Sequence, residues 1–277
     1  MKLLVLTPTR GTSRFLHETV ASVERLQAEK RHVLVCPTAV QGELAGKFPR
    51  LEMVTDEGAG PYAALSRGLV IGGDWDAFTW INDDDTLVAE GVDKAWAGLL
   101  RNDGADVFYG RVNYMDVNGC NLGPLPVCRH PPRLPALFAA ALPALTQQGT
   151  LVRRRLAGQL GGFDPRYALA GDFDYWARAL KLAATFRHVP ELVARYRLHR
   201  GQLSSDLVRL DREIGESSRM HFTAAHFIQR ATRIGFRLAH LPDLARRFAR
   251  TGCWRTSSLY RRAMTTHAET ERSHGGT

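Results

Sequence analysis

Three consecutive carboxylates follow a short apolar segment in the first third of the chain. Asp83, Asp84 and Asp85 follow residues 77–81, whose apolar run is typical of a buried strand, with only Asn82 between. Adjacent carboxylates repel one another, and a bound cation relieves that repulsion. Their hard oxygen atoms suit Mg²⁺ or Mn²⁺, which commonly bridge to phosphate oxygens. An acidic turn that caps the following helix is the other interpretation, and on these residues alone it stays open.

A second acidic pair, Asp172 and Asp174, stands at the start of a helix predicted over residues 171–181. A carboxylate there can accept hydrogen bonds from the first backbone amides of the helix. Asp172 could instead face a cleft and act as a general base that takes a proton from a hydroxyl nucleophile. Both interpretations of Asp172 stay open, whereas we expect Asp174 to act only as a cap.

Basic side chains add two weaker signals. His199 stands among arginines, and an isolated histidine is more often structural than a metal ligand. Arg153, Arg154 and Arg155 could bind phosphate, although a run of like charges is usually a solvated helix face.

The apolar pattern predicts which elements position these residues. Strand patterns cover residues 2–6, 32–36, 51–54 and 77–81. Helix patterns cover residues 60–71 and a second stretch, which Thr12 or Ser13 can cap and which ends near Gln27. Such alternation predicts an α/β fold with a mostly parallel central sheet flanked by helices. Ligands bind beyond the carboxyl ends of the strands in such sheets, where the acidic triplet lies.

The pattern changes after residue 100. We expect a strand and turn over 106–117, a proline-rich loop over 124–135, a short strand over 147–152, a helix from Arg153 and short strands around Pro190. From Asp206 onward helical patterns dominate and predict a C-terminal helical extension.

The composition is that of an ordinary globular protein, but the charge is unevenly placed. The chain has 277 residues, 44% of them hydrophobic, and a formal net charge of +9. Residues 1–217 hold 26 basic and 25 acidic side chains, whereas residues 218–277 hold 11 and 3. A neutral body gives nucleic acid no matching basic stripe, so we expect no nucleic-acid partner.

Neither a membrane span nor a disulfide framework is predicted. The longest apolar run, residues 134–145, is interrupted by two prolines, and the N-terminal apolar stretch is too short for a signal peptide. Four cysteines without paired spacing are typical of a reducing compartment. We therefore expect a soluble cytoplasmic protein.

Taken in order, these segments resemble the family 2 glycosyltransferases, the inverting sugar transferases of the GT-A fold, over roughly residues 3–204. The similar segments are Val5–Thr9, Gly60–Gly68 (the family's G-x-Y-D-A-x-N-K-G), Thr79–Asp85 (its D-x-D region), Val107–Gly110 with Asp116–Gly119, Gln147–Arg154, Gly161–Asp164 with Gly171–Arg178 (its G-G-F-D and E-D-x-D-x-W-x-R), and Tyr196–His199 (its Y-R-x-H). Each segment is a weak signal alone, and their common order makes the resemblance specific.

The resemblance implies a function and a set of roles. It implies an enzyme that moves a sugar from a nucleotide-sugar donor to a hydroxyl acceptor with inversion, the acceptor being a glycan or lipid-linked glycan of surface polysaccharide biosynthesis. Residues 1–204 would form the GT-A domain and residues 205–277 a basic helical extension. The implied roles are nucleotide-sugar binding by Thr7, Pro8, Thr9, Arg67, Asn82 and Asp83, binding of Mn²⁺ or Mg²⁺ by Asp84, Asp85 and His199, proton removal by Asp172, and an acceptor wall, or alternatively a core position, for Trp176.

Three positions depart from the family pattern. Cys36-Pro37-Thr38 ends the second strand, where the family has acidic residues that read the base and ribose; Ala63 replaces another acid, and Asn82 precedes the paired aspartates. These departures leave the nucleobase open and keep a non-catalytic sugar-binding relative as one alternative. A metal-dependent nucleotidyltransferase, which uses similar nucleotide-and-metal geometry, is the other alternative.

The basic C-terminal part has two open interpretations. Apolar residues and arginines interleave over residues 232–262, and Pro242 and Gly252 divide this stretch into short helices with one apolar and one cationic face. The apolar face could pack on the catalytic domain, or it could bind an anionic membrane surface. The second interpretation places the protein peripherally at the inner face of the membrane, where it would suit a lipid-linked acceptor.

Overall fold

The computed structural model describes residues 1–262 except 57, 72 and 102–103, so the last part of the predicted extension lies outside the described residues. Its strands are β1 (Leu3–Pro8), β2 (Lys30–Cys36), β3 (Glu52–Thr55), β4 (Ala77–Trp80), β5 (Thr86–Leu87), β6 (Val107–Met115), β7 (Asn121–Leu125), β8 (Leu151–Arg153) and β9 (Phe186–Arg197). Its helices are α1 (Leu16–Glu24), α2 (Thr38–Lys47), α3 (Pro61–Ile71), α4 (Ala89–Leu100), α5 (Leu134–Ala139), α6 (Arg154–Leu160), α7 (Gly171–Lys181), α8 (Leu207–His221), α9 (His226–Ala239) and α10 (Leu241–Thr251).

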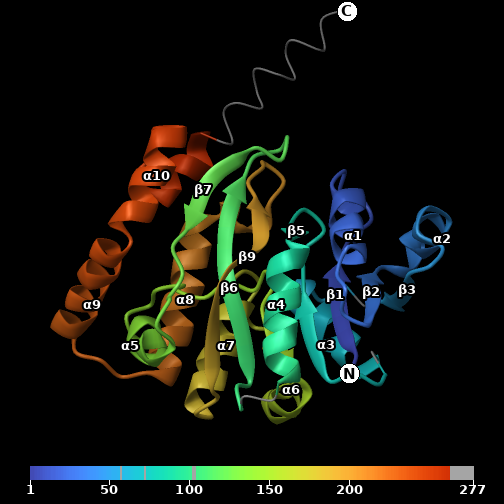
Figure 1. The fold of residues 1–277 in the computed structure, drawn as a ribbon, viewed down its shortest axis with the longest axis horizontal. Helices are drawn as coiled ribbons and strands as arrows, with labels where there is room; N and C mark the ends of the chain where they lie inside the picture. Colours follow the sequence, from blue (N-terminus) through green and yellow to red (C-terminus); the bar gives the residue numbers. More distant parts are fainter. Residues whose placement is uncertain (57, 72, 102–103, 263–277) are drawn as a thin grey trace, which may run out of the picture.

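The strands of the described chain form one sheet in the order β3-β2-β1-β4-β8-β6-β9-β5, with β7 paired to β6 (Figure 1). β1 pairs in parallel with β2 and β4, β2 with β3, and β6 with β9. β5, β7 and β8 run antiparallel to their neighbours. The sheet is therefore mostly parallel, and the predicted α/β class is confirmed.

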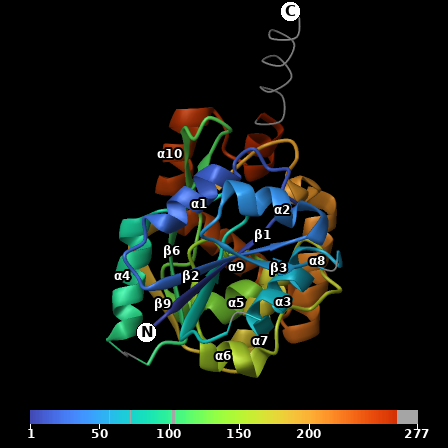
Figure 2. The same cartoon turned by 90° about the vertical axis from the view of Figure 1, so that its right-hand side faces the viewer.

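Helices cover both faces of the sheet because successive strand residues point to opposite sides. On β1, Leu3 and Val5 pack with α1 and α4, whereas Leu4 and Leu6 pack with α3 and the helices on the other face. Figure 2 shows this layering from the side of the N-terminal strands. The apolar, doubly covered strand β1 leaves its carboxyl end as the part of the strand open to a ligand.

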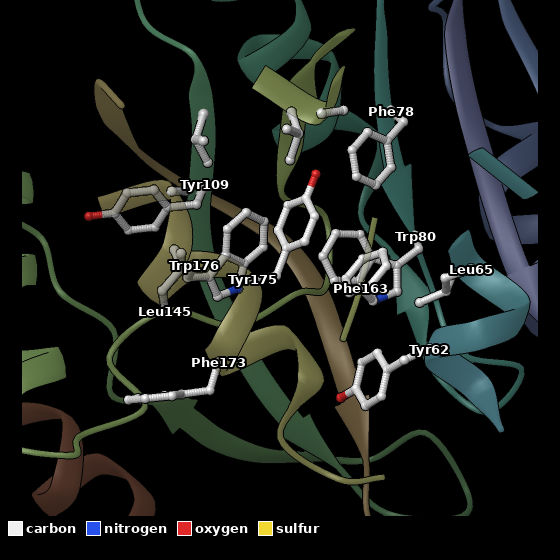
Figure 3. Packing of buried hydrophobic residues seen from close by; sticks show 14 of the residues in the cluster. Tyr62, Leu65, Phe78, Trp80, Tyr109, Leu145, Phe163, Phe173, Tyr175 and Trp176 are labelled. Carbon is white, nitrogen blue, oxygen red and sulfur yellow. The ribbon is translucent and has the colours of Figure 1, made fainter. Parts of the chain in front are cut away.

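Aromatic rings fill the core beside β4. Trp80 and Trp176 have no exposed surface and stack with ring centroids 5.5 Å apart, and Phe163 and Tyr175 complete the group (Figure 3). A side chain that is enclosed on all sides cannot contact a substrate. The predicted acceptor wall is therefore wrong for Trp176, which occupies the alternative core position.

Carboxylates of α7 and α8 join these two helices. Asp174, 1% exposed, accepts hydrogen bonds from Arg178 Nε (2.8 Å) on its own helix and from His221 Nε2 (2.9 Å) on α8. Glu213 of α8 accepts from the backbone N–H of Ala170 (3.0 Å), immediately before α7 begins. Asp174 is thus an interhelical anchor rather than the predicted cap, and α8 supplies the acceptor for the start of α7.

Several predicted boundaries shift for identifiable reasons. α1 begins at Leu16, later than predicted, and the hydroxyl of Ser13 accepts from the backbone N–H of Phe15 (3.3 Å) just before the helix while it donates to Asp83 O (2.8 Å). β8 is confined to Leu151–Arg153, since Gly149 turns the chain with a φ of 70°. The predicted short strands around Pro190 form one strand, β9, whose pairing with β6 shifts register near the proline, which has no N–H to donate.

In the residues that the structure describes, no helix has both the length and the hydropathy to cross a bilayer. The four cysteines are all free thiols.

We expect Asp174→Asn to lower the free energy of unfolding by about 2 kcal/mol, because it removes the buried charged acceptor of a partly buried arginine and histidine. Asp211→Asn on the exposed side of α8 is the matched control and should change stability little. Urea denaturation measures both. An equal, small loss in the two variants would contradict the anchoring role.

Candidate active site

A cleft of about 1570 Å³ opens at the carboxyl ends of β1 and β4. Its donor-side wall, as we name it here, is the part lined by residues 8–10, 12–15, 37, 56, 58, 60–62, 64–65 and 82–84. The facing wall is lined by residues of α7 to α10, of the loop 142–148 and of the segment 254–260. The cleft gathers the predicted site residues Pro8, Thr9, Asn82, Asp83, Asp84, Asp172 and His199.

The three consecutive aspartates have three different environments. Asp83 accepts a hydrogen bond from Thr9 Oγ1 (2.5 Å), and burial raises its pKa to about 6. Asp84 Oδ2 lies 2.8 Å from His199 Nε2, while its other oxygen, Oδ1, is buried and has no hydrogen-bond partner. Asp85 has no exposed surface, and burial together with the neighbouring Asp84 charge raises its pKa well above the usual range.

Asp85 is held by protein donors instead of facing the cleft. Its Oδ2 accepts from Gln148 Nε2 (2.9 Å), and its Oδ1 accepts from the backbone N–H of Arg197 (2.8 Å). Both oxygens are therefore occupied. The predicted metal-ligand role of Asp85 is therefore wrong. Asp85 has a structural role, because it ties residues 83–85, which we call the acidic loop, to β9 and to Gln148.

Arg197 fixes the backbone of the acidic loop from beneath. Its side chain has no exposed surface, and its Nε donates to Asp84 O at 2.8 Å. Its Nη1 donates to Val117 O (3.1 Å), its Nη2 pairs with Glu18 (2.6 Å), and the guanidinium lies 4.2 Å from the ring centroid of Phe15. The sequence placed Arg197 only within a motif. Arg197 and His199 stand two positions apart at the end of a predicted strand. This spacing was the signal in the sequence that both belong to the same site.

The Asp84–His199 pair has the donor set of a divalent-cation site. A carboxylate oxygen without a partner and an imidazole nitrogen stand side by side, and Mn²⁺ accepts both ligand types. Among the described residues, no three His, Cys, Asp or Glu side chains come together as a complete metal site. The residues present therefore fit a cation that draws its remaining ligands from a bound molecule or water.

Asp172 faces the same cleft from the first turn of α7. Its Oδ1 accepts from the backbone N–H of Phe173 (2.8 Å) and from Tyr62 OH (3.3 Å), and burial raises its pKa to about 6. A Cβ at Gly171 would lie 2.6 Å from the ring of Tyr62, so the absence of a side chain there allows Tyr62 to reach Asp172. A carboxylate with this pKa is largely ionised at neutral pH and can still accept a proton.

Two predicted nucleotide-binding residues lie elsewhere. Thr7 is fully buried in the sheet, where its Oγ1 lies 2.9 Å from His32 Nε2. Arg67 is exposed on α3 and does not line the cleft. Both predictions are corrected: alternate residues of β1 point away from the cleft, and the helical position of residue 67 points outward.

Sequence reasoning missed Asp56, one residue after the end of β3. Asp56 lines the donor-side wall, and its backbone N–H donates to Cys36 O (2.9 Å) at the end of β2. An acid therefore lies beside the position where Cys36 departs from the family pattern. An acidic residue directly after a parallel strand was the available signal. The facing wall carries further basic residues that the sequence did not place, Arg237 and Arg255.

No protein family matches the sequence, and no curated protein is similar to it. Solved structures do match the fold. S. aureus TarS is 16% identical with a TM-score of 0.58, over 87% of this chain and 43% of TarS, so the chain spans less than half of that protein. Residues 1–349 of TarS in complex with UDP-GlcNAc are 15% identical with a TM-score of 0.59, over 95% of this chain and 79% of theirs. The mannosyltransferase PcManGT from Pyrobaculum calidifontis, in complex with GDP-Man and Mn²⁺, is 14% identical with a TM-score of 0.58, over 89% and 74%. The chain thus has a fold that occurs in glycosyltransferases.

We expect Arg197→Gln to lower the free energy of unfolding by about 3 kcal/mol, because several buried carbonyls and Glu18 lose their donor. Arg195→Gln is the control: Arg195 lies on the same strand with an exposed side chain and should tolerate the change. Chemical denaturation compares the two. Comparable stabilities would show that the acidic loop does not depend on the guanidinium.

Proposed function

We propose that the protein transfers a sugar from a nucleotide-sugar donor to a hydroxyl group of an acceptor, with inversion at the anomeric carbon. The observation that carries the proposal is that one cleft brings together the Asp84–His199 pair and the carboxylate of Asp172. Two of the similar structures contain a nucleotide sugar, UDP-GlcNAc in one and GDP-Man in the other. A glycan or lipid-linked glycan is the acceptor class that we propose.

The donor nucleotide lies along the donor-side wall in this proposal. Thr9, Asn82 and Asp83 offer hydrogen-bonding groups beside the Asp84–His199 pair. Asp56 replaces the acidic residues missing at the end of β2, because its carboxylate can accept hydrogen bonds from ribose hydroxyls or base N–H groups. Arg10 and Arg14 line the same wall and offer positive charge to the diphosphate.

Asp84 and His199 would hold the divalent cation, Mn²⁺ or Mg²⁺, through the unpartnered Oδ1 and the imidazole nitrogen. The chemistry that the cation supplies is neutralisation of negative charge on the departing diphosphate. Arg197 keeps Asp84 in place through the backbone carbonyl of that residue.

Asp172 acts as the general base. Its carboxylate accepts the proton of the acceptor hydroxyl while the hydroxyl oxygen bonds to the anomeric carbon and the bond from that carbon to the diphosphate breaks. Tyr62 orients the carboxylate through its hydroxyl. Attack from the face opposite the leaving group gives inversion.

Incubation of the protein with Mn²⁺ and a panel of nucleotide sugars, followed by detection of free nucleoside diphosphate, tests the function. Release of nucleoside diphosphate supports sugar transfer or its hydrolytic side reaction. In a parallel incubation with nucleoside triphosphates and a sugar 1-phosphate, release of pyrophosphate would instead identify a nucleotidyltransferase, and neither product would identify a binding protein. Asp84→Ala should abolish the release and most cation-dependent nucleotide binding, because a methyl group cannot replace a hard oxygen ligand. Turnover within a few-fold of the unmodified protein would contradict the cation site.

We expect Asp172→Asn to lower turnover by about 10² to 10⁴ with nucleotide affinity unchanged, because an amide cannot accept the proton. Turnover of the unmodified protein should rise with pH through about 6 and level off above it, since only the ionised carboxylate works as a base.

A stability measurement separates this role from a capping role. Because the pKa of Asp172 is higher in the folded than in the unfolded chain, its ionisation destabilises the fold as the pH rises above about 4. Asp172→Asn should therefore raise Tm at pH 7 and leave it nearly unchanged at pH 4. A lower Tm at pH 7, or lost nucleotide affinity, would identify Asp172 as a structural cap.

A further inference from the structure

The helices α9 and α10 lie at one edge of the molecule, beside α5 and β7 (Figures 1 and 2). Their inner side is fixed to the body: Arg233 Nε donates to Ala140 O (2.8 Å), and the imidazole of His240 lies between the carbonyls of Phe236 (2.9 Å) and Val127 (2.8 Å). Phe236, His240 and Leu244 on this side also line the cleft. The helix pair thus forms part of the wall of the cleft. Its inner side packs on the body of the protein, as the first interpretation of the basic tail predicts.

The outer side of the same helices carries apolar residues that belong to none of the hydrophobic clusters found in the described part of the chain. We call this set the outer stripe: Phe227, Ile234, Leu238, Leu241 and Phe248, which are 74, 51, 59, 48 and 40% exposed. Steps of seven and four residues place Phe227, Ile234 and Leu238 on one face of α9, and a step of seven places Leu241 and Phe248 on one face of α10. Within the described residues α9 contains no buried residue at all. A row of large apolar side chains on one surface, in place of scattered ones, marks an interaction site.

The charge around the outer stripe is almost entirely positive. Residues 222–262 contain nine arginines and one acidic residue, Asp243. Asp243 is 3% exposed and already pairs with Arg129 and Arg246. Exposed arginines such as Arg230 and Arg250 therefore lie on the same two helices as the stripe, without an acidic side chain of their own segment to neutralise them.

We propose that the outer stripe and its arginines bind the protein to the surface of a membrane that contains anionic lipids. Apolar side chains enter the boundary between headgroups and acyl chains, and arginines contact the lipid phosphates. Phe248 and Trp254, stacked with ring centroids 4.7 Å apart, give the aromatic group that such interfaces favour.

Charge and composition favour an anionic membrane over the other partners that could cover the outer stripe. A second copy of the chain would bring the same arginines against one another, which opposes a dimer through this face. Residues 263–277 offer only one large apolar side chain, Met264, and so cannot cover the stripe. Single-stranded nucleic acid binds through stacked aromatic rings, whereas three of the five stripe residues, Ile234, Leu238 and Leu241, are aliphatic.

Flotation of the full-length protein with vesicles tests the proposal. Vesicles of phosphatidylcholine with about 30% phosphatidylglycerol should bind the protein, in a manner that weakens with salt, and vesicles of phosphatidylcholine alone should bind it much less. Phe227→Gln, Ile234→Gln and Leu238→Gln together should abolish binding, and none of these residues lines the cleft. Val70→Gln, Leu182→Gln and Val208→Gln together are the matched control, because these apolar residues are 82, 52 and 84% exposed on other helices or their ends.

A charge variant provides a second, independent measurement. Arg230→Gln with Arg250→Gln should weaken binding to the anionic vesicles roughly 30-fold, about fivefold per arginine. Arg25→Gln with Arg50→Gln, on the far part of the chain, should leave it unchanged. Equal binding to both vesicle types, or equal loss in a variant and its control, overturns the proposal. A dimer that the stripe variant abolishes, or retention of single-stranded RNA without vesicle binding, assigns the surface to those partners and also overturns it.

Discussion

The electrostatic repulsion among three adjacent carboxylates is the constraint around which the site is built. One of the three, Asp85, is withdrawn from water and takes its hydrogen bonds from Gln148 and from the backbone of Arg197. The guanidinium of Arg197 then places a positive charge under the loop and holds the carbonyl of Asp84, a residue 113 positions earlier in the sequence. This unlike charge offsets part of the repulsion. Asp83 and Asp84 are left to face the cleft, and β4 and β9 are fixed relative to each other by the same contacts.

The two walls of the cleft have different origins. The donor-side wall comes from a continuous stretch of chain, residues 8–84, whose parallel strands bring their carboxyl ends to one edge. The facing wall is assembled from α7, α8, α9 and α10, which depend on contacts between distant segments. A change on the donor-side wall therefore acts on one compact unit, whereas a change in any C-terminal helix can alter the position of Asp172.

The sequence predicted the fold better than the site. Alternating apolar segments identified β1 to β4 and α3, and the bounds of α7 were predicted as they stand, because those elements are doubly covered or strongly periodic. The sequence was a weaker guide to which of two nearby residues points into the cleft and which points away from it. Thr7 and Asp85 point away from the cleft while Thr9 and Asp84 point into it, and a short strand followed by an irregular loop carries no periodic signal for that choice. Asp56 was missed because its relation to β2 exists only once β3 has paired with it.

The dependence of α7 on α8 has a consequence for how the protein forms on the ribosome. Glu213 accepts from the N–H of Ala170, at the entry to α7, although the two residues are 43 positions apart. The N-terminal strands can pair as soon as they emerge, since domains fold from the end that is made first. The helix that carries Asp172 obtains its acceptor only after α8 has been synthesised. Translation that stops between β9 and α8 would therefore leave a formed sheet with an unfinished cleft, not a shorter version of the working protein.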